Sequence, residues 1–483
     1  MQDSLKSLHY SIRPRTLAKY LGLLALMLAS LASVPLLVSI LAGEYALSKR
    51  YLTVILLLVV AGLPSLRLPH PADIQYNESL AITALAFIIA PLIMSYPMMG
   101  AGLSFMDAWF EAVSGVTTTG LSTIADLGKM PTTFLFARAW MQWYGGLGIV
   151  VLSVALLMKH HIALRRLVNP GGESMITTTR IYARRVLIVY VVLTLLGFGL
   201  LFLILHDPFL ALTHTMAAVS TGGFSSLNSS LAHLPWQAQF GITLLGLSGA
   251  IPFILYYRLS RGSWREVLTD IEVCTLLGIT LLISLLLTLS LTGLSGMNWG
   301  DATRHGFLLG ISAQTTTGFS SLNLGDLDPL SLGLLILAMV IGGGAGSTAG
   351  GFKILRLLIV VRLIQLSVQR TAMPAHAVSE PRLYDKALES DEIERALLLI
   401  ILFMIVILVS WLIFLAYGHQ PLQALFEVAS AVGTVGLSSG LTSQALEPLL
   451  KAVLCIDMTL GRLEIIALLV VFYPGTWLGK RME

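Results

Sequence analysis

Charged residues are scarce in this sequence. Only 12% of its 483 residues are Asp, Glu, Lys or Arg, whereas soluble globular proteins carry roughly 25%. Hydrophobic residues make up 56% of the chain, and the mean hydropathy is +0.83. About half of the usual charge is missing, so the composition excludes a soluble globular protein and predicts a polytopic membrane protein.

Cysteine and the signatures of several other protein classes are also missing. The only two cysteines, Cys274 and Cys455, lie in or beside apolar runs, which excludes a disulfide framework and a thiolate metal site. The polar segment Met1–Lys19 precedes a long apolar run without a small-residue cleavage site, so we expect no cleaved signal peptide. Nothing resembles a nucleic-acid-binding module, and the phosphate-binding GxxxxGK[ST] motif is absent.

Clusters of catalytic residues are absent as well. A membrane enzyme would need a nucleophile with a base, or a set of metal ligands, within the spans. His206, His214 and His305 lie near the outer ends of apolar runs, without a carboxylate or cysteine at ligand spacing. No span carries arginines at every third position, as a voltage sensor would. The sequence therefore favours neither an enzyme nor a voltage-gated channel, and it indicates no organic cofactor.

Long apolar runs are what the sequence has in abundance. A membrane-spanning helix needs about 20 apolar residues, and two spans are expected at Tyr20–Leu41 and Leu52–Leu66. Four cycles follow, each with a span, a short reentrant segment and a second span. Their expected segments are Leu80–Met98, Phe105–Thr123 and Thr132–Met158; Arg185–Leu205, Pro208–Ser226 and Trp236–Tyr257; Ile271–Leu291, Thr303–Ser321 and Leu330–Ile364; and Ala396–Tyr417, Pro421–Ser439 and Pro448–Phe472.

Four turns rich in Gly, Ser and Thr mark the cycles. They read TTTGLST, STGGFSS, TTTGFSS and GTVGLSS, and they align on Gly120, Gly223, Gly318 and Gly436. The helix expected before the first turn has about 12 residues and reaches about 18 Å, roughly half of a bilayer. Irregular backbone at that depth is tolerated only where it lines water or is buried in protein. The repetition therefore predicts a pseudo-fourfold arrangement around one aqueous path.

These features predict an all-α polytopic membrane protein of about ten spans. We expect an N-terminal two-span extension in residues 1–76, followed by four span/reentrant-loop/span repeats. The repeats are expected at residues 77–158, 181–260, 271–366 and 390–474.

The chemistry of the four turns suits an alkali cation. Backbone carbonyls aimed at an axis can replace the water shell of a cation without adding net charge, and glycine permits the unusual dihedral angles that this requires. One such turn alone would more often be a site of close helix packing, but four copies in corresponding positions favour a cation filter. The predicted filter residues are Thr118, Thr119, Gly120, Thr221, Gly222, Gly223, Thr316, Thr317, Gly318, Thr434, Val435 and Gly436.

The predicted span Leu330–Ile364 contains a run rich in glycine, Gly342–Gly351. Each glycine costs a helix about 1 kcal/mol relative to alanine, so the helix should break there. A break below a filter can occlude a pore or swing aside, whereas the structural alternative is a tight packing kink.

Arg462 and Glu464 lie inside the predicted last span. An intramembrane charge is costly, and it indicates function by default. Facing the pore, Arg462 would repel cations. Asp457 is a possible salt partner, and a purely structural ion pair is the alternative reading.

Two carboxylates precede their filter glycines by nine residues. These are Glu111 and Glu427; His214 holds that place in the second repeat, and Leu309 breaks the series in the third. We expect the polar residues to brace the turns by hydrogen bonds rather than to bind the ion.

Lysine and arginine concentrate on one side of the predicted spans. They gather in the N-terminal segment, in residues 159–185, 258–265 and 353–395, and at Lys480 and Arg481. By the positive-inside rule, both termini and these loops are expected to be cytoplasmic. The reentrant segments then enter the membrane from outside.

The four turns, Gly145–Gly148 and the IGGGAGSTAGGFK segment at 341–353 resemble the TrkH/KtrB branch of the Trk/Ktr/HKT superfamily of potassium transporters. The resemblance covers nearly the whole chain from about Leu80, and the extra N-terminal spans are similar to the TrkH type. It implies potassium as the transported ion, four filter glycines as its ligands, and glycine rather than serine at Gly120 as a mark of potassium selectivity. It also implies a gate below the filter, formed by Gly343, Gly344, Ala345, Gly346, Ser347, Gly350 and Arg462.

The same resemblance implies a homodimer in the cytoplasmic (inner) membrane and a cytosolic, nucleotide-binding TrkA-like regulatory subunit. The basic linker Arg356–Arg395 is a candidate docking segment for that subunit. A sodium-permeable, or sodium- or proton-coupled, transporter of the same superfamily is the alternative. A coupled carrier should place charged or unwound sites near the midplane, and the near absence of carboxylates in the spans disfavours it.

Overall fold

A computed structural model of the protein describes residues 11–69, 74–160, 175–260, 262–374, 381–383 and 386–478. Its regular structure is helical, except for one antiparallel pair of two-residue strands. These are β1 (Arg382–Leu383) and β2 (Lys386–Ala387), with Arg382 opposite Ala387. The predicted all-α fold is therefore confirmed.

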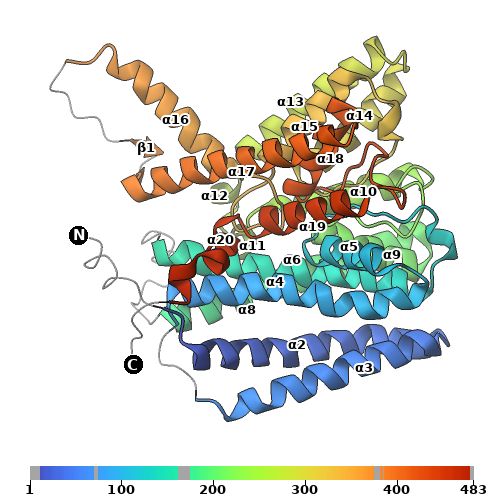
Figure 1. Ribbon diagram of the computed structural model, residues 1–483. Helices are drawn as coiled ribbons and strands as arrows, with labels where there is room; N and C mark the ends of the chain where they lie inside the picture. The colour runs from blue at the N-terminus through green and yellow to red at the C-terminus, as the bar shows by residue number, and fades with distance from the viewer. Residues whose placement is uncertain are drawn as a thin grey trace.

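The N-terminal extension is a helical hairpin. α2 (Pro14–Leu41) and α3 (Tyr45–Gly62) lie side by side along one edge of the molecule (Figure 1). A short 3₁₀ helix, Leu63–Arg67, continues α3. Pro14 starts α2 because its fixed φ suits the first helical position, where no amide donor is needed.

Four cycles of a long helix, a short helix, a loop and a further helical segment follow the hairpin. The first consists of α4 (Tyr76–Met98), α5 (Phe105–Val116) and α6 (Thr132–His160), and the second of α8 (Met175–Leu205), α9 (Pro208–Val219), α10 (Trp236–Ala250) and α11 (Phe253–Leu259). α12 (Trp264–Leu268) leads to the third, with α13 (Ile271–Gly293), α14 (Trp299–Gln314), α15 (Pro329–Ile341) and α16 (Ile354–Arg370). The fourth consists of α17 (Ser390–Ala416), α18 (Pro421–Val432), α19 (Pro448–Arg462) and α20 (Ile466–Phe472).

Several helices are longer than the predicted spans. α3 begins at Tyr45 rather than Leu52, and α8 begins at Met175 rather than Arg185. In α3 the exposed Lys49 lies within the first turns. A charged residue at the polar end of a helix adds to its length but not to its apolar run, so hydropathy alone places the limit too far inside.

The span predicted at Trp236–Tyr257 is not one straight helix. α10 and α11 meet at an angle of 96°. Ile251 is extended at the junction, and Pro252 follows it. Proline has no amide hydrogen to continue the helix, and it disfavours helical geometry in the residue before it.

The second spans of the third and fourth cycles are also interrupted. The chain between α15 and α16 is irregular, as the glycine run predicts. The helix breaks within the span predicted at Pro448–Phe472: α19 ends at Arg462, and α20 begins after Glu464 and Ile465. These two residues have φ of 53° and 61°, in the left-handed region that interrupts a right-handed helix.

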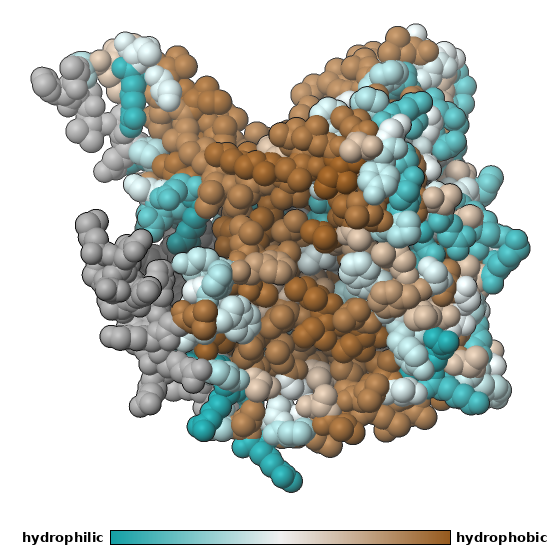
Figure 2. All heavy atoms as spheres, in the orientation of Figure 1, coloured by the Kyte–Doolittle hydropathy of each residue, from teal (hydrophilic) through white to brown (hydrophobic). Residues whose placement is uncertain are grey.

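The outer surface of the helices suits a bilayer. In the described chain, six helices are long and apolar enough to cross a membrane, and the bent pair α10–α11 makes a seventh candidate. Figure 2 shows hydrophobic residues over the middle of the visible helices, with hydrophilic residues gathered toward the right-hand edge. Exposed apolar side chains occur on several of the long helices, among them Leu195, Leu203, Leu285, Ile401 and Leu412.

The short helices have well-defined starts. Ser104 accepts the Asp107 amide at the start of α5, and Asp207 accepts the amides of Phe209 and Leu210 at the start of α9. Side-chain caps of this kind satisfy amides that have no partner within the helix. These caps fix the first residues of α5 and α9.

The two ends of the described chain meet. The Ile12 amide donates to the Thr476 carbonyl at 3.0 Å, and Arg13 forms an ion pair of 2.8 Å with the buried Glu78 on α4. The beginning of α2 and the segment after α20 therefore lie on the same side of the helices.

Candidate functional site

The four glycine-containing turns are built in the same way. The short helices α5, α9, α14 and α18 each end four residues before the aligned glycine. After each helix a threonine adopts a left-handed conformation, with φ between 49° and 54°, and two residues later the glycine has φ between 74° and 95°. The threonines are Thr118, Thr221, Thr316 and Thr434. Such alternation is strained for threonine and easy for glycine.

The amides of the four turns point back toward their helices. Each left-handed threonine donates its amide to the carbonyl three residues earlier, at 3.0 to 3.1 Å. The next residue donates to the carbonyl five residues earlier, at 2.7 to 2.9 Å; these donors are Thr119, Gly222, Thr317 and Val435. Because the helix ends hold the amides, the carbonyls of the turns remain available to another partner.

The turns form a closed ring. A Cβ atom added to Gly120 would lie 2.2 Å from the Gly222 carbonyl oxygen of the second turn. The other contacts are equivalent: Gly223 to Thr317 at 2.4 Å, Gly318 to Val435 at 1.9 Å, and Gly436 to Thr119 at 2.1 Å. The contacts run from first to second, second to third, third to fourth, and fourth back to first. Each glycine therefore lies against the carbonyl that precedes the next glycine.

Most oxygens of this ring have no donor in the described part of the chain. The exception among the carbonyls of the twelve predicted filter residues is Gly222, which accepts from Gln142 Nε2. The hydroxyls of Thr118 and Thr434 are buried and also have no hydrogen-bond partner in the described chain. Unpartnered buried oxygens are unfavourable unless a ligand compensates them, and a dehydrated cation is such a ligand.

The expected bracing of the first and fourth turns is confirmed. Glu111 accepts the Ser122 hydroxyl at 2.7 Å and the Thr123 amide at 3.0 Å. Its other oxygen forms a buried ion pair of 2.8 Å with Arg138.

Glu427 accepts the hydroxyl groups of Ser438, Ser439 and Thr442, and the Ser439 amide, at 2.6 to 2.9 Å. Both carboxylates are therefore used by the protein rather than aimed at an ion.

Histidines take this role in the other two repeats. His214 reaches the Ser225 hydroxyl at 3.0 Å, and His305 reaches the Ser321 hydroxyl at 2.8 Å. Sequence reasoning missed His305 because Leu309 occupies the aligned position. His305 precedes Leu309 by four residues, so it lies on the same face of α14 one turn earlier, and that spacing could have identified it.

The irregular chain between α15 and α16 lies directly against three of the four turns. The Gly350 amide donates to the Thr316 hydroxyl at 2.7 Å, and the Gly351 amide donates to the Gly433 carbonyl at 3.1 Å. The Thr348 hydroxyl donates to the Val219 carbonyl, the last residue of α9, at 3.1 Å. The segment therefore contacts the last residue of α9, the third turn and the residue that follows α18.

Contacts on its other side hold the same segment in place. The Ala345 amide donates to the carboxylate of Glu272 on α13 at 2.7 Å, and the Gly344 amide donates to the Ala250 carbonyl at 3.2 Å. Gly342, Gly346 and Gly351 have φ between 72° and 75°, which explains why this loop is rich in glycine.

Arg462 binds this loop rather than an acidic partner. Its Nη1 donates to the Thr348 carbonyl at 2.8 Å, while Nε and Nη2 are buried without a partner in the described chain. The suggested ion pair with Asp457 is wrong, because Asp457 accepts the Ser410 hydroxyl at 2.7 Å. Arg462 therefore places its charge next to the loop that covers the ring.

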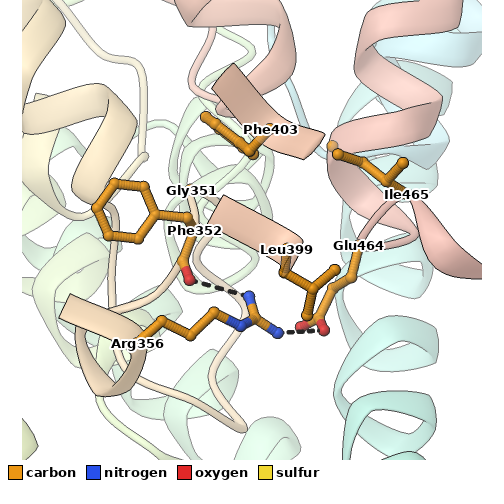
Figure 3. A pocket seen from close by; sticks show the side chains of 8 residues that line it. Gly351, Phe352, Arg356, Leu399, Phe403, Glu464 and Ile465 are labelled. Carbon is orange, nitrogen blue, oxygen red and sulfur yellow. Dashed lines mark hydrogen bonds and ion pairs between the residues drawn. The ribbon is translucent and has the colours of Figure 1, made fainter. Parts of the chain in front are cut away.

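A pocket lies beneath the loop, between its end and the break that separates α19 from α20 (Figure 3). Arg356, near the start of α16, donates to the Phe352 carbonyl at 2.9 Å and forms an ion pair with Glu464. Glu464 is thus the partner of Arg356, not of Arg462. The pair joins the end of the loop to the break in the last span.

The segments that follow the first and second turns are joined to each other by side-chain hydrogen bonds. Asn228 donates to Asp126 at 3.0 Å and accepts the Leu127 amide at 2.6 Å, so it connects the segments after the first and second turns. The hydrogen bond from Asn228 and the neighbouring Lys129 hold the pKa of the Asp126 carboxyl below its ordinary value. Asp126 is therefore negatively charged at neutral pH.

Comparisons with known proteins identify a family and several relatives of this chain. A family model described as TrkH, cation transport protein, matches residues 49–476. An uncharacterized cation transporter of Methanocaldococcus jannaschii is 31% identical over 412 residues, 84% of each chain. The Trk system potassium uptake protein TrkI of Halomonas elongata is 30% identical over 475 residues, which are 95% of this chain and 96% of that protein.

Two TrkH proteins match almost end to end. The Trk system potassium uptake protein TrkH of Escherichia coli K12 is 28% identical over 482 residues, 96% of this chain and 99% of that protein. The crystal structure of the potassium transporter TrkH from Vibrio parahaemolyticus matches with a TM-score of 0.86 and 26% identity. It covers 96% of this chain and 100% of the other.

Proposed function

This chain belongs to the TrkH family of cation transport proteins, and from that membership we propose that it takes up potassium across the cytoplasmic membrane. The observation that carries the proposal is the closed ring of turns. In this ring each aligned glycine lies against the carbonyl of the residue just before the aligned glycine of the next repeat. Relatives named as potassium uptake proteins support potassium as the transported ion.

In the proposed mechanism, carbonyl oxygens of the four turns replace the hydration shell of potassium. The carboxyl-terminal ends of α5, α9, α14 and α18 precede the turns, and their partial negative charge favours a cation over an anion. The hydroxyls of Thr118 and Thr434 add unpartnered oxygens at the inner end. The ion ligands would come from the twelve filter residues predicted from the sequence. There are three in each turn, the first being Thr118 and the last Gly436.

We propose that the loop between α15 and α16 is the gate. Its amides and hydroxyls bind the inner ends of three turns, and Arg462 lies on it with two unpartnered N–H groups in the described chain. A fixed positive charge beside a narrow path raises the barrier to a cation. The gate residues would be Gly343, Gly344, Ala345, Gly346, Ser347, Gly350 and Arg462, and the gate opens when this loop leaves the ring.

Regulation would come from a second protein. α16 leads from the gate to the basic segment before α17, so a soluble subunit bound there could pull on the loop (Figure 1). We propose a TrkA-like nucleotide-binding subunit, a homodimer of this chain, and cytoplasmic termini. The meeting of the chain ends at Ile12 and Thr476 supports placing both on one side.

The alternative is a sodium-permeable or a sodium- or proton-coupled transporter. Coupling would need a titratable group that faces the ion path. Glu111 is neutralised by Arg138, and Glu427 accepts four hydrogen bonds from the fourth repeat. Their use in bracing favours a gated potassium path.

Cation flux into liposomes that contain the purified protein tests the proposal. We expect the wild type to pass potassium and rubidium in preference to sodium. Gly436→Ser should reduce that preference by about tenfold, equivalent to about 1.4 kcal/mol, because its Cβ would lie 2.1 Å from the Thr119 carbonyl oxygen.

Gly440→Ser is a matched control, because Gly440 also has positive φ but open space around a Cβ. It should keep the wild-type preference. Equal passage of sodium by the wild type, or wild-type behaviour of Gly436→Ser, would contradict the proposed filter.

A further inference from the structure

The second filter turn lacks two residues that the other turns have at equivalent positions. The first is a serine six residues before the glycine. Ser114 and Ser430 use their hydroxyls to accept the amides of Gly120 and Gly436 at 3.0 Å. The third turn has Ser312 at this position, whose hydroxyl is buried without a partner in the described chain, whereas the second has Ala217.

The second of these residues carries a side chain just before the glycine. The first, third and fourth turns have Thr119, Thr317 and Val435 there, but the second has Gly222. The hydroxyls of Thr119 and Thr317 bond to threonine hydroxyls two residues earlier at 2.7 to 2.8 Å. Gly222 can make no such contact, so the second turn is the least supported by its own residues.

Gln142 on α6 supplies the missing support from outside the turn. Its side chain is fully buried. Nε2 donates to the Gly222 carbonyl, and Oε1 accepts the Phe224 amide at 3.2 Å. The amide group therefore holds the backbone on both sides of Gly223.

Gln142 also fills the space of the absent side chain. A Cβ added to Gly222 would lie 2.5 Å from Gln142 Cδ. One turn earlier on α6, Arg138 donates to the Ser225 carbonyl at 3.1 Å and lies 3.9 Å from the centre of the Phe224 ring. This face of α6 thus holds the second turn from Gly222 to Ser225.

The opposite pairing of a helix residue with a filter residue occurs between α10 and the third turn. Gly145 on α6 and Gly249 on α10 both lie against the last carbonyl of a short helix, so the two positions correspond. Three residues before them stand Gln142 and Gly246. A Cβ on Gly246 would lie 2.5 Å from the hydroxyl of Thr317. In one case the large helix residue Gln142 thus faces the filter glycine Gly222. In the other, the helix glycine Gly246 faces the larger filter residue Thr317.

We propose that Gln142 is a positioning residue that determines cation preference by holding the Gly222 carbonyl in the ring of four. This inference rests on the proposed filter and identifies a side chain outside it on which its selectivity depends. Without Gln142 the peptide between Gly222 and Gly223 can rotate, because neither its carbonyl nor its amide has another partner in the described chain. Three fixed carbonyls and one mobile carbonyl discriminate less well between cations of different size.

The test is the permeability ratio of potassium to sodium in liposomes for a cycle of variants. Gln142→Gly and Gly222→Thr should each lower the ratio by roughly tenfold, the effect of one buried hydrogen bond lost. The first removes the support, and the second forces a side chain into it. The double variant recreates the pairing of Gly246 with Thr317, so it should recover most of the ratio.

Gln239→Gly is the matched control. Gln239 is also buried, and it donates to the carbonyls of Leu231 and Leu234, outside the ring. It should leave the ratio unchanged. If Gln142→Gly cannot be purified in folded form, the nearly isosteric Gln142→Met replaces it, since a thioether cannot donate to the Gly222 carbonyl.

An unchanged ratio in Gln142→Gly or its isosteric replacement, or a double variant no better than the poorer single variant, would overturn the proposal. The measured quantity is the shift relative to the wild type, so it applies whichever cation the wild type prefers. A wild type that does not prefer potassium would contradict the proposed function, whereas an unshifted ratio contradicts only the role of Gln142.

Discussion

At the scale of single residues, equivalent positions in different repeats carry side chains of different chemical type. Nine residues before the filter glycine stand Glu111, His214 and Glu427, each of which accepts or exchanges hydrogen bonds with its turn. Of these three, only Glu111 has a cationic partner in the described part of the chain, Arg138, which is itself 2% exposed. The two carboxylates therefore stabilise similar turns, but only the loss of the Glu111 charge would leave a buried cation without its partner.

This difference predicts unequal costs of neutralisation. Glu111→Gln leaves the Arg138 charge buried without its partner, which should cost about 3–5 kcal/mol. Glu427→Gln breaks hydrogen bonds but strands no cation, so it should cost about 1–3 kcal/mol. Thermal unfolding of the purified protein in detergent measures both. Equal losses of stability would show that the Arg138 pair is not the larger contribution.

At the scale of elements, the loop between α15 and α16 and the filter share atoms. The Thr316 hydroxyl accepts the Gly350 amide, so the ring and the gate use the same oxygen. Gly350 is also confined by the fourth turn, because a Cβ there would lie 2.2 Å from the Thr434 hydroxyl. If the loop is the gate, as we propose, its closure would take one oxygen away from a passing ion.

Thr316→Val should loosen the gate, since it keeps the side-chain shape but removes the acceptor of the Gly350 amide. Loss of about 1 kcal/mol from the closed state predicts a rise of about fivefold in flux without any regulatory subunit. Thr118→Val is the matched control, because the Thr118 hydroxyl has no partner in the described chain. An equal rise in both variants would indicate a change in conduction rather than in gating.

At the scale of the whole molecule, the fourth repeat must close on the first. α5 and α19 are joined by a buried ion pair in which Lys451 Nζ lies 2.6 Å from Asp107 Oδ1. Lys451 also donates to the Gln444 carbonyl at 2.9 Å. This ion pair joins residues 344 positions apart in the sequence. Like the ring contact between Gly436 and Thr119, it links the fourth repeat to the first.

Lys451→Met should therefore destabilise the closed ring by about 3–5 kcal/mol, because it leaves the Asp107 carboxylate buried without its cation. The control is Lys129→Met, which removes an ion pair to Asp126 whose side chains are 83% and 41% exposed. Exposed pairs contribute about 0–1 kcal/mol. Thermal unfolding compares the two variants, and similar midpoints would argue against a role for Lys451 in closure.

The sequence by itself determined the class, the repeats and the candidate ring. Apolar runs and the fourfold recurrence of Gly with Ser and Thr are local properties, and they identified all four turns and the break at Gly342–Gly351. It did not identify the breaks at Pro252 and Glu464 as ends of helices. Hydropathy averages over a window, whereas a break depends on the backbone angles of one or two residues.

Only the tertiary structure decided which residues are partners. Arg138 and Gln142 are ordinary polar residues of a predicted span, and their places beside Glu111 and Gly222 depend on how α6 packs against the second repeat. The same is true of Arg356 with Glu464 and of Arg462 with the Thr348 carbonyl. Such pairs join distant segments, and a single sequence encodes the period of each helix but not the rotation of one helix against another.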